Sequence, residues 1–154
     1  IEREKECLYS SCAVIDDGEI LYNYRRITKG WKEYWKTDGH YREGDKAGEF
    51  TLHNHKIMLA LCGDLWDCLE KFKTDRLLIW PVYVNFTVEE WNRQEMDAYA
   101  RQASLAAEQV LMVNPLDHEP QNHGGSFYFR DGKIVDRLPF DQEGILVVEI
   151  ADAE

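Results

Sequence analysis

The segment Lys56–Asp67, KIMLALCGDLWD, constrains the fold more than any other part of the chain. An apolar run, Ile57–Leu61, leads directly to Cys62, and Gly63 and Asp64 follow at once. A short apolar run that stops at a turn residue is typical of a buried strand. Open α/β folds present reactive groups just beyond the carboxyl ends of such strands. The segment therefore predicts a strand of an α/β sheet with a cysteine in the turn that follows it.

Cys62 has two interpretations at this stage. As a nucleophile, it would lie in a site just beyond the end of the strand, and the backbone N–H of Gly63 could donate to a developing oxyanion. As a structural residue, it would fill space in the core, because free cysteine is among the most buried residue types. The segment alone leaves both open.

Composition limits the function classes. The chain has 154 residues, 44% of them hydrophobic, which predicts one globular domain with a real core. Its net charge of −11 argues against nucleic acid or an anionic membrane as a partner, since both bind basic surfaces. The four cysteines have no CxxC spacing, and no segment is apolar enough to cross a bilayer. We therefore expect a cytoplasmic protein.

Strand-like runs joined by turn residues recur along the chain. Three pairs predict β-hairpins: Cys12–Ile15 with Ile20–Tyr24, Phe50–Leu52 with Lys56–Leu61, and Ser126–Phe129 with Lys133–Val135. Three further strands are expected at Leu77–Trp80, Val110–Val113 and Ile145–Ile150. Numerous strands with at least one long helix imply a mixed α/β layered fold.

One helix has a clear start. Thr87 followed three residues later by Glu90 forms a capping box. Apolar residues then recur at helical spacing, so we expect a helix that runs to about Glu108. The aromatic and charged segment Trp31–Glu43 has no clean period, and we interpret it as a loop or short helix over a site.

The order of these motifs resembles that of the nitrilase (carbon–nitrogen hydrolase) superfamily. The similar segments are Leu8–Gly18 with Tyr24-Arg25-Arg26, Glu43-Gly44-Asp45 with Phe50, Ala60–Asp67, Trp80–Tyr83, Ala100–Ala103 with Val113-Asn114, and Gly124–Ser126 with Asp131-Gly132. No single motif is specific, but six in the family's order cover nearly the whole chain.

The resemblance implies a four-layer α-β-β-α sandwich and a Glu-Lys-Cys catalytic set. The reaction would be hydrolysis of a non-peptide C–N bond in a small amide or carbamoyl compound, through a thioester and without a metal or organic cofactor. Cys62 would be the nucleophile and the Gly63 N–H an oxyanion donor. Trp66 and Tyr83 would line the substrate pocket, and Asp64 would orient the turn. Homo-oligomerisation is also common in this family.

Two departures weaken the expectation of activity. Arg26 stands where the family has its lysine; Lys29, three residues on, is the other candidate for that role. Arginine can stabilise an oxyanion but does not release its proton as lysine does. The family's general-base glutamate has no counterpart at a suitable distance before the first hairpin. We therefore expect residues 1–154 to be a single nitrilase-like domain without its N-terminal part, inactive on its own.

The remaining candidates come with alternatives. Asp38, or else Glu33, could be the second acid that assists in some family members, although each could equally be a loop acid. The main hypothesis is a carbon–nitrogen hydrolase; the alternative is a non-catalytic nitrilase-like binding module, favoured by Arg26 and the missing glutamate.

The histidines allow two rival sites. His53 and His55, joined by His118 or His123, could bind zinc, but the first two lie in an expected turn and no acidic ligand has diagnostic spacing. A Cys62–His123 hydrolase is the other rival, for which the sequence gives no positional constraint. We expect no metal.

Overall fold

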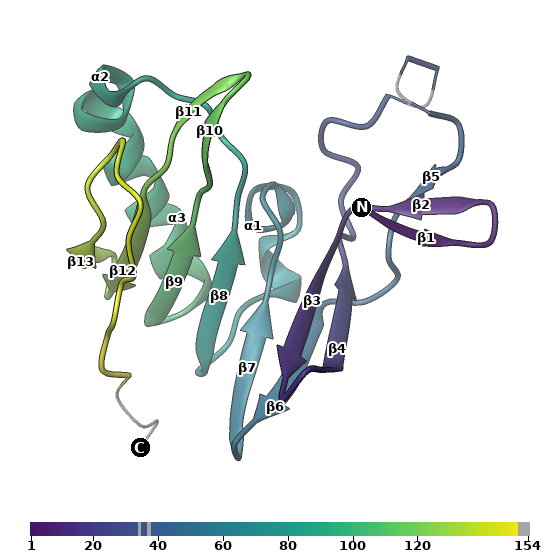
Figure 1. Ribbon diagram of the computed structural model, residues 1–154. Coiled ribbons are helices and arrows are strands. Elements are labelled where there is room, and N and C mark those ends of the chain that lie inside the picture. Colours follow the sequence, from purple (N-terminus) through teal and green to yellow (C-terminus); the bar gives the residue numbers. More distant parts are fainter. Residues whose placement is uncertain (34, 37, 151–154) are drawn as a thin grey trace.

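A six-stranded mixed sheet forms the centre of the computed structural model, which describes residues 1–33, 35–36 and 38–150 (Figure 1). The strands, in their order across the sheet, are β13 (Lys133–Arg137), β12 (Ser126–Arg130), β9 (Gln109–Val113), β8 (Leu77–Pro81), β7 (His55–Leu59) and β6 (Gly48–Leu52). Neighbours β7, β8 and β9 are parallel, and the outer strands pair antiparallel. The carboxyl ends of β7, β8 and β9 therefore meet at one edge.

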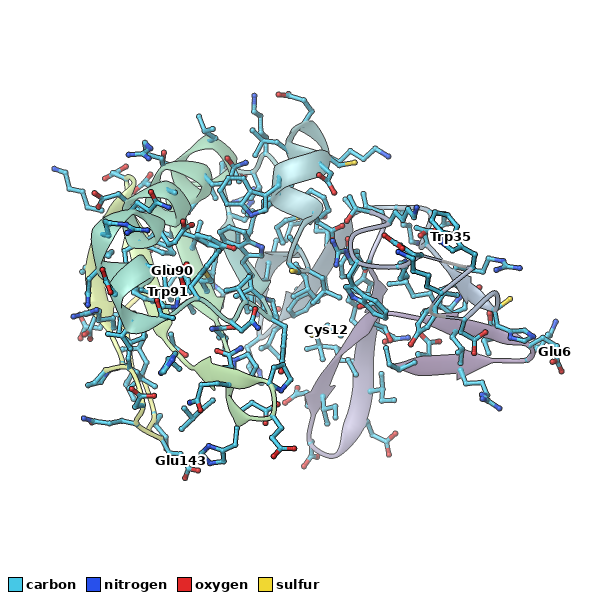
Figure 2. The ribbon with its side chains drawn as sticks, turned by 90° about the horizontal axis from the view of Figure 1, so that it is seen from above. Glu6, Cys12, Trp35, Glu90, Trp91 and Glu143 are labelled. Atoms are coloured by element: carbon cyan, nitrogen blue, oxygen red, sulfur yellow. The ribbon has the colours of Figure 1, made fainter. Side chains whose placement is uncertain are left out.

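Helices lie along one face of this sheet (Figures 1 and 2). They are α1 (Asp64–Asp67), the 3-10 turn η1 (Leu69–Lys71), α2 (Val88–Glu90), the π-helical turn η2 (Trp91–Glu95) and α3 (Met96–Ala106). The predicted capping box is present, since Thr87 Oγ1 accepts from the Glu90 N–H at 3.2 Å and Glu90 accepts from the Thr87 N–H at 2.8 Å. None of the helices in the described ranges has the length and apolar character needed to span a bilayer.

An aromatic core joins the helices to the sheet. Trp80 of β8 stacks on Tyr99 of α3 with ring centroids 5.2 Å apart, and Trp91 packs against Tyr99 and against Phe127 of β12. Both tryptophans are fully buried. Alternate residues of the sheet fill this side, which fits the two-residue period of a strand: Leu78, Trp80, Val110, Met112, Phe127 and Phe129.

Three smaller sheets complete the described part of the molecule. Strands β3 (Ser11–Asp16) and β4 (Glu19–Arg25) form one hairpin, and β10 (Leu116–His118) pairs with β11 (Gln121–His123). Strands β1 (Glu2–Glu4), β2 (Cys7–Tyr9) and β5 (Tyr41–Arg42) form a small sheet. Seen from above, the β1–β2 hairpin projects away from the main sheet with Glu6 at its tip (Figure 2).

The three predicted hairpins are confirmed, and their turns explain why. Asp17 and Gly18 both have positive φ, as do His53 and Asn54, and Asp131 and Gly132. Two residues of positive φ are what a two-residue turn between right-twisted strands requires. The strands expected at Leu77–Trp80 and Val110–Val113 are also present, as β8 and β9.

The expected strand at Ile145–Ile150 is wrong. This segment follows the sheet's edge strand but pairs with no described strand, and Ile145 and Val147 are 86% and 81% exposed. An apolar run without a ladder partner gains no strand structure. The segment Trp31–Glu43 is a loop that carries β5, with Tyr34 and Thr37 outside the described residues. Because the described residues supply one large sheet with helices on one face, the fold is mixed α/β and the four-layer sandwich stays a prediction.

Candidate functional site

Two cavities open at opposite ends of the parallel strands, one of about 700 Å³ and one of about 610 Å³. Cys62, the predicted nucleophile, lines the smaller one. The 610 Å³ cavity lies at the carboxyl ends of β7 and β8, beside the segment that follows β4; we call it the Cys62 cavity. Its lining residues are Ile1, Ser10, Arg26, Trp31, Leu61, Cys62, Pro81, Val82 and Tyr83. The other hollow lies at the opposite end, around the β6–β7 turn.

Cys62 occupies a strained turn between β7 and α1. Its φ is +47°, a left-handed conformation that side-chain-bearing residues adopt at a cost. Two hydrogen bonds hold this backbone: the Cys62 N–H donates to the Pro81 carbonyl, and the Trp80 indole N–H donates to the Cys62 carbonyl, each at 2.8 Å. The turn thus fixes a partly buried thiol against the end of β8.

Asp64 is the polar centre of this turn. It is fully buried, and its two carboxylate oxygens accept four hydrogen bonds: from Tyr24 Oη at 2.7 Å, from the Thr28 N–H and hydroxyl at 3.1 and 2.8 Å, and from the Leu61 N–H at 2.9 Å. Burial and the neighbouring Asp64 raise the pKa of Tyr24, which keeps this hydroxyl a donor. Asp64 therefore ties the end of β4, the following loop and the nucleophile turn together.

Arg26 lies beside Cys62 and is 3% exposed. Its Nε donates to the Thr28 hydroxyl at 2.8 Å and lies 4.0 Å from Asp64 Oδ1. A Cβ atom built on Gly63 would stand 2.3 Å from Arg26 Nη2, so the guanidinium packs directly against the residue that follows Cys62. The backbone of Arg26 is fixed as well, with its N–H bonded to the Ser10 carbonyl at 2.8 Å.

The Gly63 N–H is available at this site. Within the described part of the chain it has no acceptor, whereas the Gly63 carbonyl accepts from the N–H groups of Trp66 and Asp67 as α1 begins. A backbone N–H next to a nucleophile can donate to an oxyanion that forms there.

Lys29 and Asp38 lie elsewhere in the loop. Lys29 is exposed, with its Nζ 5.2 Å from the centre of the Trp35 ring, and neither residue lines the Cys62 cavity. The Asp38 carboxylate accepts from the backbone N–H and contacts the ring of His40, and these bonds lower its pKa. Glu33 pairs with Lys36 at 2.8 Å. Of the two basic candidates, the structure brings only Arg26 to Cys62.

The two aromatic candidates point in different directions. Tyr83 is 46% exposed and lines the cavity, where its hydroxyl donates to Asp117 at 3.2 Å; partial desolvation first, and this bond second, raise its pKa. Trp66 does not line the cavity but packs on Trp80 and Tyr99 at the helical layer. Trp66 is the third residue of α1, and its ring projects toward Tyr99 of α3.

The histidines do not converge. His53 is in the β6–β7 turn, and His123 Nδ1 lies 2.7 Å from Asp141. Among the described residues, no three side chains of His, Cys, Asp or Glu are grouped so that they could hold a metal ion. His123 is also not among the described residues that line the Cys62 cavity.

Sequence reasoning missed a buried ion pair under the loop. Lys32 is fully buried, and its Nζ lies 2.9 Å from Glu43 Oε1 and 3.3 Å from the Arg42 carbonyl. No periodicity marks Lys32 as buried, so composition alone gave no signal for it. The pair holds the loop against the segment that leads into β6.

No family model and no curated protein sequence matches this chain. Solved structures do resemble it. A carbon–nitrogen hydrolase from Helicobacter pylori G27 has a TM-score of 0.71 and 20% identity, over 93% of this chain and 56% of that chain. The glutamine-dependent NAD+ synthetase from Acinetobacter baumannii has a TM-score of 0.70 and 19% identity, over 88% of this chain and 27% of that chain.

A third similar structure is that of an amidase with a modified cysteine. A variant of the amidase from Nesterenkonia sp. AN1 carries acrylamide added to its active-site cysteine; its TM-score is 0.57 and its identity 15%, over 79% of this chain and 49% of that chain. The chain thus spans about half the length of the hydrolase and amidase structures. At these identities the likeness is one of fold, and the chain has the fold found in that half of the nitrilase and carbon–nitrogen hydrolase structures.

Proposed function

We propose that this chain carries the nucleophile half of a carbon–nitrogen hydrolase that acts on a small amide or carbamoyl compound. The observation that supports it most is the arrangement around Cys62: a strained turn at the carboxyl end of β7, an available Gly63 N–H, and a buried guanidinium from Arg26. The amidase with acrylamide on its active-site cysteine supports the same assignment by fold likeness.

The proposed chemistry has two stages. Cys62 Sγ attacks the substrate carbonyl carbon, and the oxyanion that forms accepts from the Gly63 N–H and is stabilised by the Arg26 charge. The C–N bond then breaks, the amine leaves with the thiol proton, and a thioester remains. Water attacks the thioester, which releases a carboxylic acid and restores the thiol.

A base is still required for both proton transfers. Arginine stays protonated in proteins, so Arg26 does not serve. Among the described residues that line the Cys62 cavity there is no carboxylate. The base would then be supplied by a further segment or by a second chain, and homo-oligomerisation stays a prediction. Turnover by residues 1–154 alone should be slow.

Acyl trapping tests the proposal without needing the base. The chain is incubated with p-nitrophenyl butyrate, whose good leaving group needs no proton, and the acyl adduct is located by peptide mapping. We expect the butyryl group on Cys62, and no adduct in Cys62→Ser. Cys68→Ser is the matched control, since Cys68 follows α1 and does not line the cavity. Equal acylation of all four cysteines would refute a nucleophile at Cys62.

A further inference from the structure

The buried guanidinium of Arg26 forms part of the wall of the Cys62 cavity, and most of the other lining residues are apolar. Arg26 is 3% exposed and is the only residue with a charged side chain among the described residues that line the cavity. Leu61, Val82 and Trp31 are among the apolar residues around it. A charge removed from water in such surroundings is stabilised by an anion that reaches it.

Only one side of the guanidinium is occupied. Nε donates to the Thr28 hydroxyl, but Nη1 and Nη2 have no hydrogen-bond acceptor among the residues that the structure describes. Asp64, the nearest carboxylate, lies 4.0 Å from Nε and already accepts four hydrogen bonds, which fills the roughly four acceptor positions of a carboxylate. The Nη edge therefore remains available to a bound molecule.

Two glycines leave room for this edge. A Cβ atom on Gly30 would stand 2.2 Å from Arg26 Nη2, and one on Gly63 2.3 Å from the same atom. Any side chain at either position would push the guanidinium from its place. The slot between these glycines holds the Nη groups beside Cys62, at the wall of the cavity.

We propose that the Cys62 cavity binds small carboxylates with an apolar body, and that the carboxylate pairs with Nη1 and Nη2 of Arg26. The planar fork of a guanidinium matches a carboxylate through two parallel hydrogen bonds, which a lysine cannot provide. The aromatic side chains of Trp31 and Tyr83 give an apolar ring surfaces to contact. This inference names the ligand class of the proposed hydrolase site and rests on that proposal for the cavity's role; an acid is also what the hydrolysis would release.

Calorimetric titration with benzoate and benzamide tests the assignment. The two probes have nearly the same shape, but only benzoate carries a charge. We expect benzoate to bind the wild-type chain at least about tenfold more tightly than benzamide, because a charge-assisted pair replaces a neutral contact. Equal affinity for the two, or no saturable binding of benzoate, would overturn the proposal.

Variants assign the preference to Arg26. Arg26→Gln should remove the preference for benzoate, whereas Arg130→Gln, an exposed arginine on β12, should retain it. Arg26→Lys keeps the charge without the fork, and should bind benzoate more weakly than the wild type. An unchanged preference in a folded Arg26→Gln chain would refute the assignment.

A measurement on the wild type alone covers the case in which the Arg26 variants do not fold. Benzoate should slow the alkylation of Cys62 by iodoacetamide, while benzamide at the same concentration should not, and Cys68 serves as the internal reference. Equal rates with and without benzoate would contradict binding beside Cys62.

Cys62→Ser separates this proposal from the hydrolase. It should keep the preference for benzoate and lose acylation by p-nitrophenyl butyrate. Acylation of wild-type Cys62 without any benzoate preference would overturn the ligand class and leave the hydrolase standing. A benzoate preference with no acylation of Cys62 would support the ligand class and overturn the hydrolase.

Discussion

The indole N–H of Trp80 donates to the backbone carbonyl of Cys62 at 2.8 Å, so the core of the sheet directly holds the nucleophile turn. Trp80 is fully buried and stacks on Tyr99 of α3. The position of Cys62 thus depends on the same side chain that joins the helical layer to β8. A substitution in that core should therefore change the position of the Cys62 thiol.

Replacing this tryptophan isolates the bond. Trp80→Phe removes the indole N–H, so the Cys62 carbonyl loses this donor. We expect the free energy of unfolding to fall by about 1–2 kcal/mol, in addition to the effect of the smaller ring. Trp91→Phe is the matched control, because Trp91 is equally buried and also packs on Tyr99, yet its Nε1 has no partner in the described part of the chain. Urea unfolding of both variants gives the comparison. Equal losses would mean that the Trp80 bond adds nothing.

The left-handed turn at Cys62 predicts an inverted order of stabilities. Glycine adopts φ near +47° without the steric cost of a Cβ, so Cys62→Gly should be more stable than Cys62→Ala by about 1 kcal/mol. In the exposed middle of a helix the order is reversed, and Arg101→Gly with Arg101→Ala provides that reference on α3. Denaturant titrations of the four variants measure both differences. A less stable Cys62→Gly would show that the turn relaxes when the thiol is removed.

Short-range chemistry made much of this fold predictable. Two adjacent residues are enough to specify a hairpin turn, as at Asp17-Gly18 and Asp131-Gly132. A helix start is specified within one turn by Thr87 and Glu90. The order of the motifs predicted that Arg26 lies near Cys62 and Gly63. The structure gives the physical reason: β4 and β7 end beside the same cavity.

What the sequence did not predict depends on distant contacts. The burial of Lys32 depends on Glu43, eleven positions away in an aperiodic loop. The direction of Trp66 depends on Trp80 and Tyr99, which reach it from another strand and another helix. The apolar pattern of Ile145–Ile150 looks like a strand, but pairing requires a neighbour that the described chain does not offer.

Asp64 should be essential for the turn. Asp64→Asn replaces one acceptor oxygen with an amide donor that faces donors already present, and the charge that strengthens the four bonds is lost. We expect a loss of about 3 kcal/mol in the free energy of unfolding. Asp67→Asn, on the exposed side of α1, should change it by less than about 0.5 kcal/mol. A small effect at Asp64 would mean that Tyr24 and Thr28 find other acceptors.

Acid sensitivity should arise at the β1–β4 contact. Hydrogen bonds from Arg25, one of them from Nε at 3.0 Å, are the main cause that lowers the pKa of Glu2 from 4.5 to about 2. Above pH 4.5 Glu2 is ionised in both the folded and the unfolded chain, so its full contribution is present. As the pH falls toward 2 the unfolded chain takes up the proton first, and the contribution is lost.

Glu2→Gln should therefore lower the urea midpoint at neutral pH and have little effect near the folded pKa. Glu6→Gln, at the tip of the same hairpin, is the control and should leave the midpoint unchanged at both pH values. A difference between wild type and Glu2→Gln that does not shrink in acid would contradict the role of the carboxylate charge.

A double-mutant cycle should connect Gly63 to Arg26. The backbone of Gly63 has φ −66°, which alanine adopts freely, so any cost of Gly63→Ala must come from the side chain it introduces. That Cβ would stand 2.3 Å from Arg26 Nη2, and overpacking of this kind costs about 1–3 kcal/mol. In an Arg26→Ala background the guanidinium is gone, and Gly63→Ala should then cost much less. Urea unfolding of the four chains gives the coupling energy, which should be at least about 1 kcal/mol for residues in contact. Additive effects would mean that the guanidinium moves aside freely, and the slot between Gly30 and Gly63 would then not hold Arg26 beside Cys62.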